Sequence, residues 1–538
     1  MEAVELTRRQ VLEALLAAPV ALAACKKAPP PPVAGSIRGA SMDVGHLLQK
    51  VRGSEPAGEA KRVGIAIVGA GPSGLSAAWR LERLGVTDYV LFDLEDRAGG
   101  TSRFGDDGVV PYPWGAHYVP MPSPDNRALV TLLSEMGAIN ASGEGAEEQL
   151  VRAPEERVFY LGKWYEGLYL RVGATAEDLA ELARFEAEIA RLVAWRDGKG
   201  RRAFTIPIAH ATDDEAVTSL DRISMETWLR DKGFKSTRLR WLIEYACRDD
   251  YGLAARDASA YAGLFYFASR TFESGETAAP LLSWPNGNGH LVEHLAKVAR
   301  DRVRAASLVT DIVPKDDGVE LTVLDVATKT LSSWRAEHVI FAAPKFTAAR
   351  VIRPWRDAAP AHLASFDYGA WMVANLHLSG RPTSRGFPTA WDNVLYDSPS
   401  LGYVVATHQK LLDHGRTVWT YYYPLTDSDP KEGRKKLLAP DHAAWCDVIL
   451  SDLSRAHEGL AAHVERIDVW RWGHAMARPR VGSMWSGARA KAAAPLGRVH
   501  FAHSDLSGMG LFEEAQYWGV AAAEAIVRAR GREVVSLL

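Results

Sequence analysis

Apolar and polar positions alternate along the chain in blocks, and one block predicts strand, helix and strand in close succession. Residues 63–68 form an unbroken apolar run, and residues 89–92 form a second one that ends at Asp93. Short apolar runs bounded by glycine are typical of strands buried on both faces in a parallel sheet. Between them, residues 75–81 have small and apolar side chains at helical spacing. The pattern predicts a βαβ unit in an α/β domain.

A glycine-rich loop joins the first of these strands to the helix. Gly69 permits a tight turn, Gly71 leaves room for a pyrophosphate, and Gly74 lets the helix and strand pack closely. Ser73 lies in the first helical turn, where free N–H groups and the positive end of the helix dipole attract phosphates. Asp93 stands where a carboxylate accepts the hydroxyls of a ribose. These offsets predict a dinucleotide-binding site.

A second signature follows Asp93. Arg97, Gly99 and Gly100 are spaced in a way that resembles the FAD-binding amine oxidase superfamily. In that family the glycine pair lets the backbone approach the flavin diphosphate. Thr101 departs from the pattern, because the family commonly has arginine there. The resemblance implies FAD as the cofactor, with these four residues beside it.

The far end of the chain resembles the same family independently. Residues 497–505 look like a strand that ends at Asp505, and a loop and an alanine-rich helix follow. The resemblance implies that Asp505 lies near the ribityl chain and that the backbone of Phe512 faces the isoalloxazine. His503 departs from the pattern, since the family usually has glycine there.

The resemblance also implies flavin contacts nearer the middle of the chain. In the strand-like segment 109–119, Trp114, Gly115 and Ala116 would pass against the flavin ring. Val309, in the first of three predicted strands (307–313, 319–325 and 338–343), would lie near the adenine. The family can attach flavin through a cysteine in the last third of the chain, and residues 472–485 contain none. We therefore expect dissociable FAD.

Chain length and patterning predict two interleaved domains, because 538 residues exceed one ordinary core. The expected fold is α/β: a Rossmann-like FAD-binding domain, similar to glutathione reductase, combined with a mixed-sheet and helical substrate domain. Helices are predicted at 175–193, within 225–251 and at 290–303, and sheet strands at 371–378 and 418–423. The expected divisions are 1–25 (export signal), 26–61 (linker), 62–125, 301–350 and 481–538 (FAD-binding), 126–300 (mainly helical substrate domain) and 351–480 (substrate-domain sheet).

The N-terminus resembles a twin-arginine export signal. Arg8 and Arg9 precede an apolar stretch, 11–24, that is too short to span a bilayer comfortably. The stretch ends at Cys25 in a sequence that resembles a bacterial lipobox. The resemblance implies twin-arginine export and a lipid anchor at Cys25 on the periplasmic side of a bacterial membrane. The alternative interpretation is a frayed amphipathic helix.

Composition limits the classes of partner. A formal net charge of −3 and a pI near 6.6 give no electrostatic case for nucleic-acid binding. No spacing of cysteine and histidine suggests a metal site. Besides Cys25 the chain has Cys247 and Cys446. A disulfide between them is one possibility, and two buried free thiols are the expected one. The sequence indicates no oligomeric state.

Catalytic residues are less clearly marked. His117 is the candidate polar group close to the flavin ring, and the alternative is a hydrogen-bonded structural histidine. Asp250, in the run Asp249-Asp250-Tyr251, is a candidate for holding a cationic substrate, against an exposed acidic helix end. The lysine that the family often has near flavin N5 is not identified, because Lys345 stands at no convincing offset.

Together these patterns predict an FAD-dependent oxidoreductase that transfers hydride from an amine or related C–H substrate to flavin N5. Oxygen or another acceptor would then reoxidise the flavin. Two alternatives stay open: a flavin-dependent isomerase or mutase without net oxidation, and a noncatalytic FAD-binding lipoprotein. Analogy of fold alone does not separate them.

Overall fold

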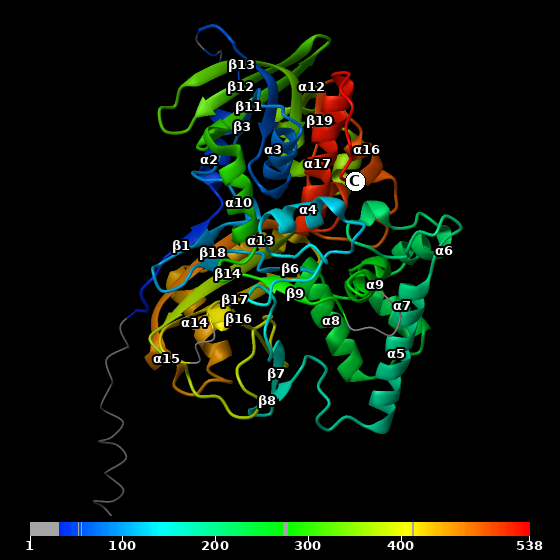
Figure 1. Cartoon of the computed structure of the whole chain (residues 1–538). Coiled ribbons are helices and arrows are strands. Elements are labelled where there is room, and N and C mark those ends of the chain that lie inside the picture. The colour runs from blue at the N-terminus through cyan, green and yellow to red at the C-terminus, as the bar shows by residue number, and fades with distance from the viewer. Residues whose placement is uncertain (1–31, 52, 55, 57, 273–277, 411–413) are drawn as a thin grey trace, which may run out of the picture.

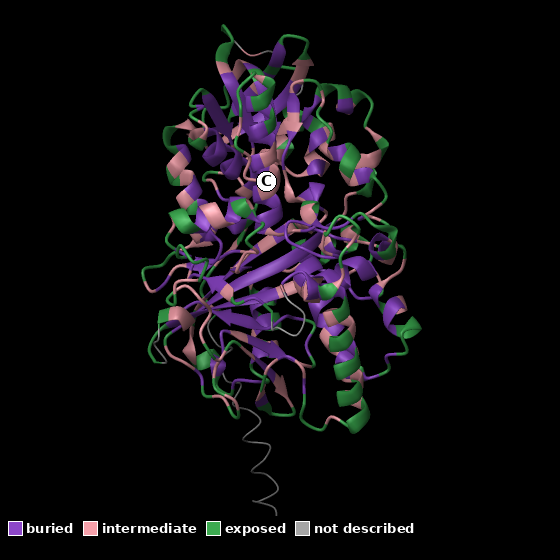
Figure 2. Ribbon diagram, turned by 45° about the vertical axis from the view of Figure 1, so that its right-hand side comes forward, coloured by how far each residue is buried: buried purple, intermediate pink, exposed green. Residues whose placement is uncertain are grey.

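Two large sheets organise the molecule, one in each lobe (Figure 1). The computed structural model describes residues 32–538 except 52, 55, 57, 273–277 and 411–413. Figure 2 shows that buried residues follow the strands of both sheets, whereas the outer side of the long helices is exposed. The predicted export signal and Cys25 lie outside the described residues.

The Rossmann-like lobe contains a seven-stranded sheet in the order β10-β3-β2-β13-β12-β11, with β19 also paired to β13. The pairs β10–β3, β3–β2, β2–β13 and β13–β19 are parallel, whereas β11, β12 and β13 pair antiparallel. Its strands are β2 (Lys61–Val68), β3 (Tyr89–Phe92), β10 (Val303–Arg304), β11 (Ser307–Lys315), β12 (Gly318–Asp325), β13 (Leu331–Phe341) and β19 (Val499–Phe501). Its helices include α3 (Pro72–Arg83), α4 (Arg127–Glu135), α10 (Gly289–Ala299), α11 (Lys345–Val351), α12 (Arg353–Asp357), α16 (Ala488–Ala493) and α17 (Phe512–Ala529).

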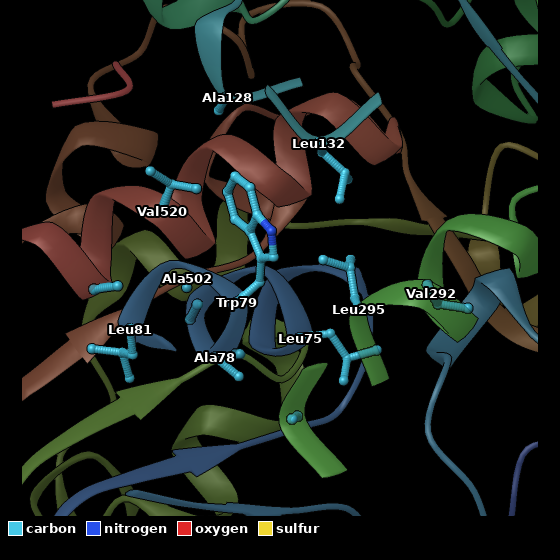
Figure 3. Packing of buried hydrophobic residues seen from close by; sticks show 14 of the residues in the cluster. Leu75, Ala78, Trp79, Leu81, Ala128, Leu132, Val292, Leu295, Ala502 and Val520 are labelled. Atoms are coloured by element: carbon cyan, nitrogen blue, oxygen red, sulfur yellow. The ribbon is translucent and has the colours of Figure 1, made fainter. Parts of the chain in front are cut away.

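The core of this lobe forms where α3 and α17 pack against each other. Trp79, on α3, is 1% exposed and lies among apolar side chains from neighbouring helices, including Leu132, Leu295 and Val520 (Figure 3). Its indole Nε1 donates to Glu135 at 2.8 Å, so the one polar atom of the ring is satisfied. The packing fixes the start of α3, which carries the glycine-rich loop.

The mixed-sheet lobe contains an eight-stranded sheet in the order β1-β18-β14-β17-β16-β15-β7-β8. The pairs β1–β18 and β15–β7 are parallel and the other pairs are antiparallel, so the predicted mixed sheet is confirmed. Its strands are β1 (Ile37–Gly39), β7 (Glu156–Tyr160), β8 (Lys163–Glu166), β14 (Tyr368–Leu378), β15 (Asp392–Leu395), β16 (Tyr403–Val405), β17 (Thr417–Leu425) and β18 (Val464–Ala477). Its helices are α5 (Ala176–Ala194), α6 (Glu215–Thr218), α7 (Met225–Asp231), α8 (Thr237–Tyr251), α9 (Ala260–Ala268), α13 (Pro430–Leu438), α14 (His442–Leu453) and α15 (Leu460–His463).

Several local predictions needed correction. The helix expected at 290–303 ends at Ala299, because Arg300 has a φ of 42° and β10 begins at Val303. The expected linker 26–61 contains strand β1 as well as a helix, α2 (Met42–Lys50). The segment 109–119 forms only short strands. These are β5 (Tyr112–Pro113), which pairs with β4 (Phe104–Gly105), and β6 (Tyr118–Pro120), which pairs with β9 (Leu281–Ser283).

The remaining sequence expectations concern cysteines, metals and membranes. Cys247 and Cys446 are buried free thiols, as expected. Among the described residues, no group of His, Cys, Asp or Glu side chains could hold a metal ion. In the same part of the chain, no helix combines the length and apolar character needed to cross a bilayer.

Candidate active site

Two glycine loops face each other at the start of α3. Gly71 is the N-cap of α3, and a Cβ added to it would meet only the Cα of Gly100, at 3.8 Å. Gly100 has a φ of 54°, and a Cβ there would lie 3.0 Å from the Cα of Gly71. The amides of Ser73 and Gly74 open the helix and therefore have no partner within it. The loops form a cradle suited to a diphosphate.

The other glycines of the loop serve packing and turning. Gly69 has a φ of 104°, and a Cβ there would lie 2.9 Å from the carbonyl oxygen of Ala342. A Cβ on Gly74 would lie 1.9 Å from the carbonyl oxygen of Gly69. Both positions exclude side chains because the protein's own backbone occupies the space.

Asp93 follows β3 and is held by backbone amides. Its Oδ2 accepts from the amide of Ala70 at 2.5 Å and its Oδ1 from the amide of Glu95 at 2.8 Å. Burial raises the pKa of Asp93 to about 6 despite these hydrogen bonds. Val309 is buried in β11, in the hydrophobic cluster that also contains Phe92. Their contacts with adenosine stay predictions.

Of the residues around the glycine pair, some contact the rest of the protein and one is exposed. Gly99 has a φ of 133°, and its amide donates to the carbonyl of Ala70 at 2.8 Å. Arg97 donates to the carbonyl of Phe104 at 2.8 Å, and its guanidinium lies 4.6 Å from the ring centre of Phe104. Thr101 is exposed at the edge of the cradle. Arg97 thus braces the loop.

The segment expected at the flavin ring packs tightly against the glycine pair. A Cβ on Gly115 would lie 2.3 Å from the carbonyl oxygen of Thr101, so this glycine makes room for protein backbone. The carbonyl of Trp114 accepts from the indole of Trp472 at 2.6 Å. The carbonyl of Ala116 accepts from the amide of Asn288 at 3.0 Å. These contacts hold the segment rigidly, and its approach to a flavin ring stays a prediction.

His117 projects among aromatic rings. Its ring centre lies 5.1 Å from those of Tyr118 and Trp391 and 5.0 Å from that of Tyr422. Tyr422 in turn donates to the carbonyl of Gly115 at 2.8 Å. Burial lowers the pKa of His117 to about 3, so its imidazole is neutral at physiological pH. We use the name aromatic chamber for this group of four rings, His117, Tyr118, Trp391 and Tyr422.

Asp250 lies close to this chamber but is already paired. Arg270 Nη2 donates to the two oxygens of Asp250 at 2.8 and 3.0 Å. The guanidinium also lies 5.7 Å from the ring centre of Tyr118 and 4.7 Å from that of Tyr266. Burial and the charge of Asp250 raise the pKa of the neighbouring Asp249 to about 7. Of the predicted acidic run, Asp249 is therefore the carboxyl without an ion-pair partner among the described residues.

Two further carboxyls join the group, and sequence reasoning missed both. Glu156 on β7 and Asp392 on β15 are register partners on adjacent strands. Burial, followed by neighbouring carboxylates, raises the pKa of Glu156 to about 8 and that of Asp392 well above its usual range. Tyr245 donates to Asp392 at 3.2 Å. Neither carboxyl has an ion-pair partner in the described parts of the chain. Only strand pairing brings them together, so no local sequence signal marks them.

The C-terminal motif places its acids inside the protein. Asp505 Oδ2 accepts from the amide of Lys345 at 2.8 Å and from the hydroxyl of Tyr368 at 2.5 Å. Its Oδ1 lies 3.0 Å from His503 Nδ1. These contacts satisfy the carboxylate within the protein, and its predicted contact with a ribityl chain is untested. Phe512 begins α17 and is buried.

Lys345 does not occupy the chamber. Its Nζ donates to the carbonyl of Ala492 at 2.9 Å and lies 3.4 Å from the ring centre of Phe501, a core residue of the Rossmann-like lobe. Burial lowers the pKa of this amine well below its usual range. Its contacts identify it as a core residue.

Comparisons with known proteins agree with this geometry. A family model described as flavin containing amine oxidoreductase matches residues 72–527. No curated protein matches the chain. A solved structure of putrescine oxidase bound to putrescine is 18% identical, covers 87% of this chain and 100% of its own, and has a TM-score of 0.65.

Two further solved structures share the fold. Cyclohexylamine oxidase from Brevibacterium oxydans IH-35A is 18% identical, covers 87% of this chain and 100% of its own, and has a TM-score of 0.62. The CLA-producing fatty acid isomerase from P. acnes is 16% identical, covers 87% of this chain and 98% of its own, and has a TM-score of 0.61. At these identities the likeness shows the fold and leaves the substrate open.

Substitutions at two glycines should separate cofactor binding from folding. Gly71→Ala places a Cβ in the cradle with no protein atom nearer than 3.8 Å, so the protein should fold but lose FAD affinity by at least tenfold. Gly74→Ala, whose Cβ would lie 1.9 Å from a backbone oxygen, should destabilise the fold itself by about 1–3 kcal/mol. FAD titration of the apoprotein and thermal unfolding measure the two effects. Wild-type FAD affinity in a folded Gly71→Ala protein would contradict the cradle.

Proposed function

Because the chain belongs to the flavin containing amine oxidoreductase family, we propose that this FAD-dependent enzyme oxidises a cationic amine. The observation that carries the proposal is an excess of carboxyls beside the aromatic chamber. Glu156, Asp249, Asp250 and Asp392 are near one another, and Arg270 is the cation paired with one of them. A ligand with positive charge would offset the cost of burying the rest.

The residues of the cradle fit the cofactor. A side chain on Gly71 would stand in the space between the two glycine loops, which matches a diphosphate that approaches backbone atoms. Asp93 would hold the ribose, and the segment from Trp114 to His117 would lie at the flavin ring. FAD, when bound, accepts a hydride from a carbon of the substrate.

The rings of the aromatic chamber supply recognition of the substrate. The rings of Tyr118, Trp391 and Tyr422 provide apolar and cation–π surfaces for an ammonium group and its carbon chain. An amine must lose its ammonium proton before hydride transfer. Asp249 and Glu156, with pKa values of about 7 and 8, lie in the range in which a carboxylate accepts a proton near neutral pH. His117 stays neutral and adds no charge that would repel the ammonium.

The same charges disfavour the principal alternative, isomerisation of a fatty acid. A carboxylate substrate needs a cation, and Arg270 is engaged by Asp250 at 2.8 Å, while Arg248 donates to the carbonyl of Ser400 at 2.8 Å. A fatty acid would also bring a further negative charge beside Asp249, which like-charge repulsion opposes. The charge balance therefore supports an amine.

Anaerobic mixing with amines tests the function. An amine substrate should bleach the flavin absorbance. Between pH 6 and pH 8, kcat/KM should rise at least about tenfold, because a carboxyl with a pKa of about 7 goes from about one-tenth to about nine-tenths ionised over that range. The sign follows from the carboxyls: with pKa values of about 7 and 8, Asp249 and Glu156 hold an ammonium only when ionised, so binding is lost as pH falls through these values.

Two variants provide the control. Glu156→Gln should raise KM about tenfold and flatten the upper part of the pH profile, whereas Glu166→Gln, exposed on β8, should behave as wild type. Rearrangement of a fatty acid without net flavin reduction, and no bleaching by any amine in a broad panel, would replace the proposal with the isomerase. A flavin inert to both would leave a noncatalytic FAD-binding protein.

We also propose, from the N-terminal sequence, that the protein is exported by the twin-arginine route and anchored through a lipid on Cys25. Replacing Arg8 and Arg9 by lysine should leave the protein in the cytoplasm, and Cys25→Ala should release it from the membrane fraction. Cell fractionation and metabolic labelling with a fatty acid measure both effects. Unchanged fractionation of the two variants would refute the proposal.

A further inference from the structure

A segment outside the family-matched region, residues 33–50, contacts both lobes. Its first half is anchored on the mixed-sheet lobe, where β1 pairs in parallel with β18 and forms the edge of the sheet. Ser36 donates to Asp468 Oδ1 through its amide at 3.1 Å and its hydroxyl at 3.2 Å. Gly35 fits so closely that a Cβ on it would lie 1.8 Å from the carbonyl oxygen of Ile467.

The second half of the segment is anchored on the Rossmann-like lobe through Glu95. The amide of Ser41 donates to Glu95 Oε1 at 2.8 Å, and its hydroxyl donates to Oε2 at 2.7 Å. Helix α2 begins directly after Ser41 and packs against β11, and Leu48 contacts the hydrophobic cluster that contains Val309. The segment therefore contacts both sides of the expected adenosine site, at Glu95 and at β11.

Glu95 is tied directly to the carboxylate expected to hold the ribose. Its amide donates to Asp93 Oδ1 at 2.8 Å, and its carbonyl accepts from the amide of Ala306, just before β11, at 2.6 Å. The side chain of Glu95 is 14% exposed, so its charge is weakly screened from Asp93. Its oxygens accept three hydrogen bonds, one from Arg103 at 2.9 Å and two from Ser41. Ser41 thus helps to hold one carboxylate in place beside another.

We propose that residues 33–50 form a clasp that retains FAD at its adenosine end, with Ser41 as the positioning residue. Ser41 fixes Glu95, and the amide of Glu95 fixes Asp93 in the orientation that receives the ribose. Ser36 anchors the other end of the segment on the mixed-sheet lobe, and the retention of FAD is assigned to the Ser41 end alone. This inference rests on FAD binding and is independent of the substrate.

The test compares three variants of the full-length holoenzyme. Ser41→Ala removes the hydroxyl donor to Glu95, Ser41→Thr retains a hydroxyl, and Ser36→Ala removes the equivalent donor at the other anchor. FAD release is followed by flavin fluorescence after dilution, and thermal unfolding is recorded for holoprotein and apoprotein. Ser41→Ala should release FAD about tenfold faster, in line with the loss of one hydrogen bond to a charged group. Ser41→Thr and Ser36→Ala should release it at close to the wild-type rate.

A purely structural role would give a different pattern. In that case Ser41→Ala would lower the unfolding temperatures of holoprotein and apoprotein equally and leave FAD release unchanged. Equal acceleration of release by Ser36→Ala would show that general docking of the segment matters, and not the contact with Glu95. Either result would overturn the proposal.

Discussion

The structure depends on the close approach of backbone segments around the first turn of α3. Gly74 must lack a side chain for α3 to start directly above Gly69, and Gly71 must lack one for the cradle opposite Gly100 to stay open. Trp79, on α3, packs against the neighbouring helices and so keeps α3 in this position. Asp93 follows β3, and Thr101 follows the glycine pair directly. Gly115 packs against the carbonyl oxygen of Thr101. The cofactor cradle and the aromatic chamber are thus connected through backbone contacts.

The carboxyls beside the aromatic chamber raise the free energy of the folded protein. Buried carboxyls without cations oppose folding unless they are protonated or paired. The raised pKa values of Asp249 and Glu156 indicate partial protonation near neutral pH. Strongly shifted pKa values are enriched at functional sites, and the pairing of β7 with β15 places these carboxyls together by geometry as well. Under the proposed function, a cationic amine is the ligand that would offset this charge.

Sequence patterns predicted the features that depend on local spacing. The βαβ unit, its glycine loop and Asp93 lie within one short stretch, so their geometry follows from strand and helix periodicity. The mixed sheet and the buried thiols were also anticipated, whereas the length of α10 was overestimated because nothing in the pattern marks the backbone of Arg300.

Features created by tertiary contacts could not be predicted. Glu156 and Asp392 meet only through the pairing of β7 with β15, and Asp250 is paired by an arginine from the end of α9. Gly115 is expected to pass against the flavin ring, and no sequence pattern shows that the carbonyl of Thr101 also lies beside it. Ser41 lies in a segment expected to be a linker, and only the fold places it against Glu95.

We propose that the glycine cradle and the aromatic chamber are two ends of one FAD site. A crystal structure of the FAD-loaded protein with a bound amine tests it most directly. We expect the diphosphate between Gly71 and Gly100, the flavin ring beside His117, and the amine nitrogen among Tyr118, Tyr422 and the neighbouring carboxyls. A diphosphate bound elsewhere, or a flavin ring that does not reach the chamber, would contradict it.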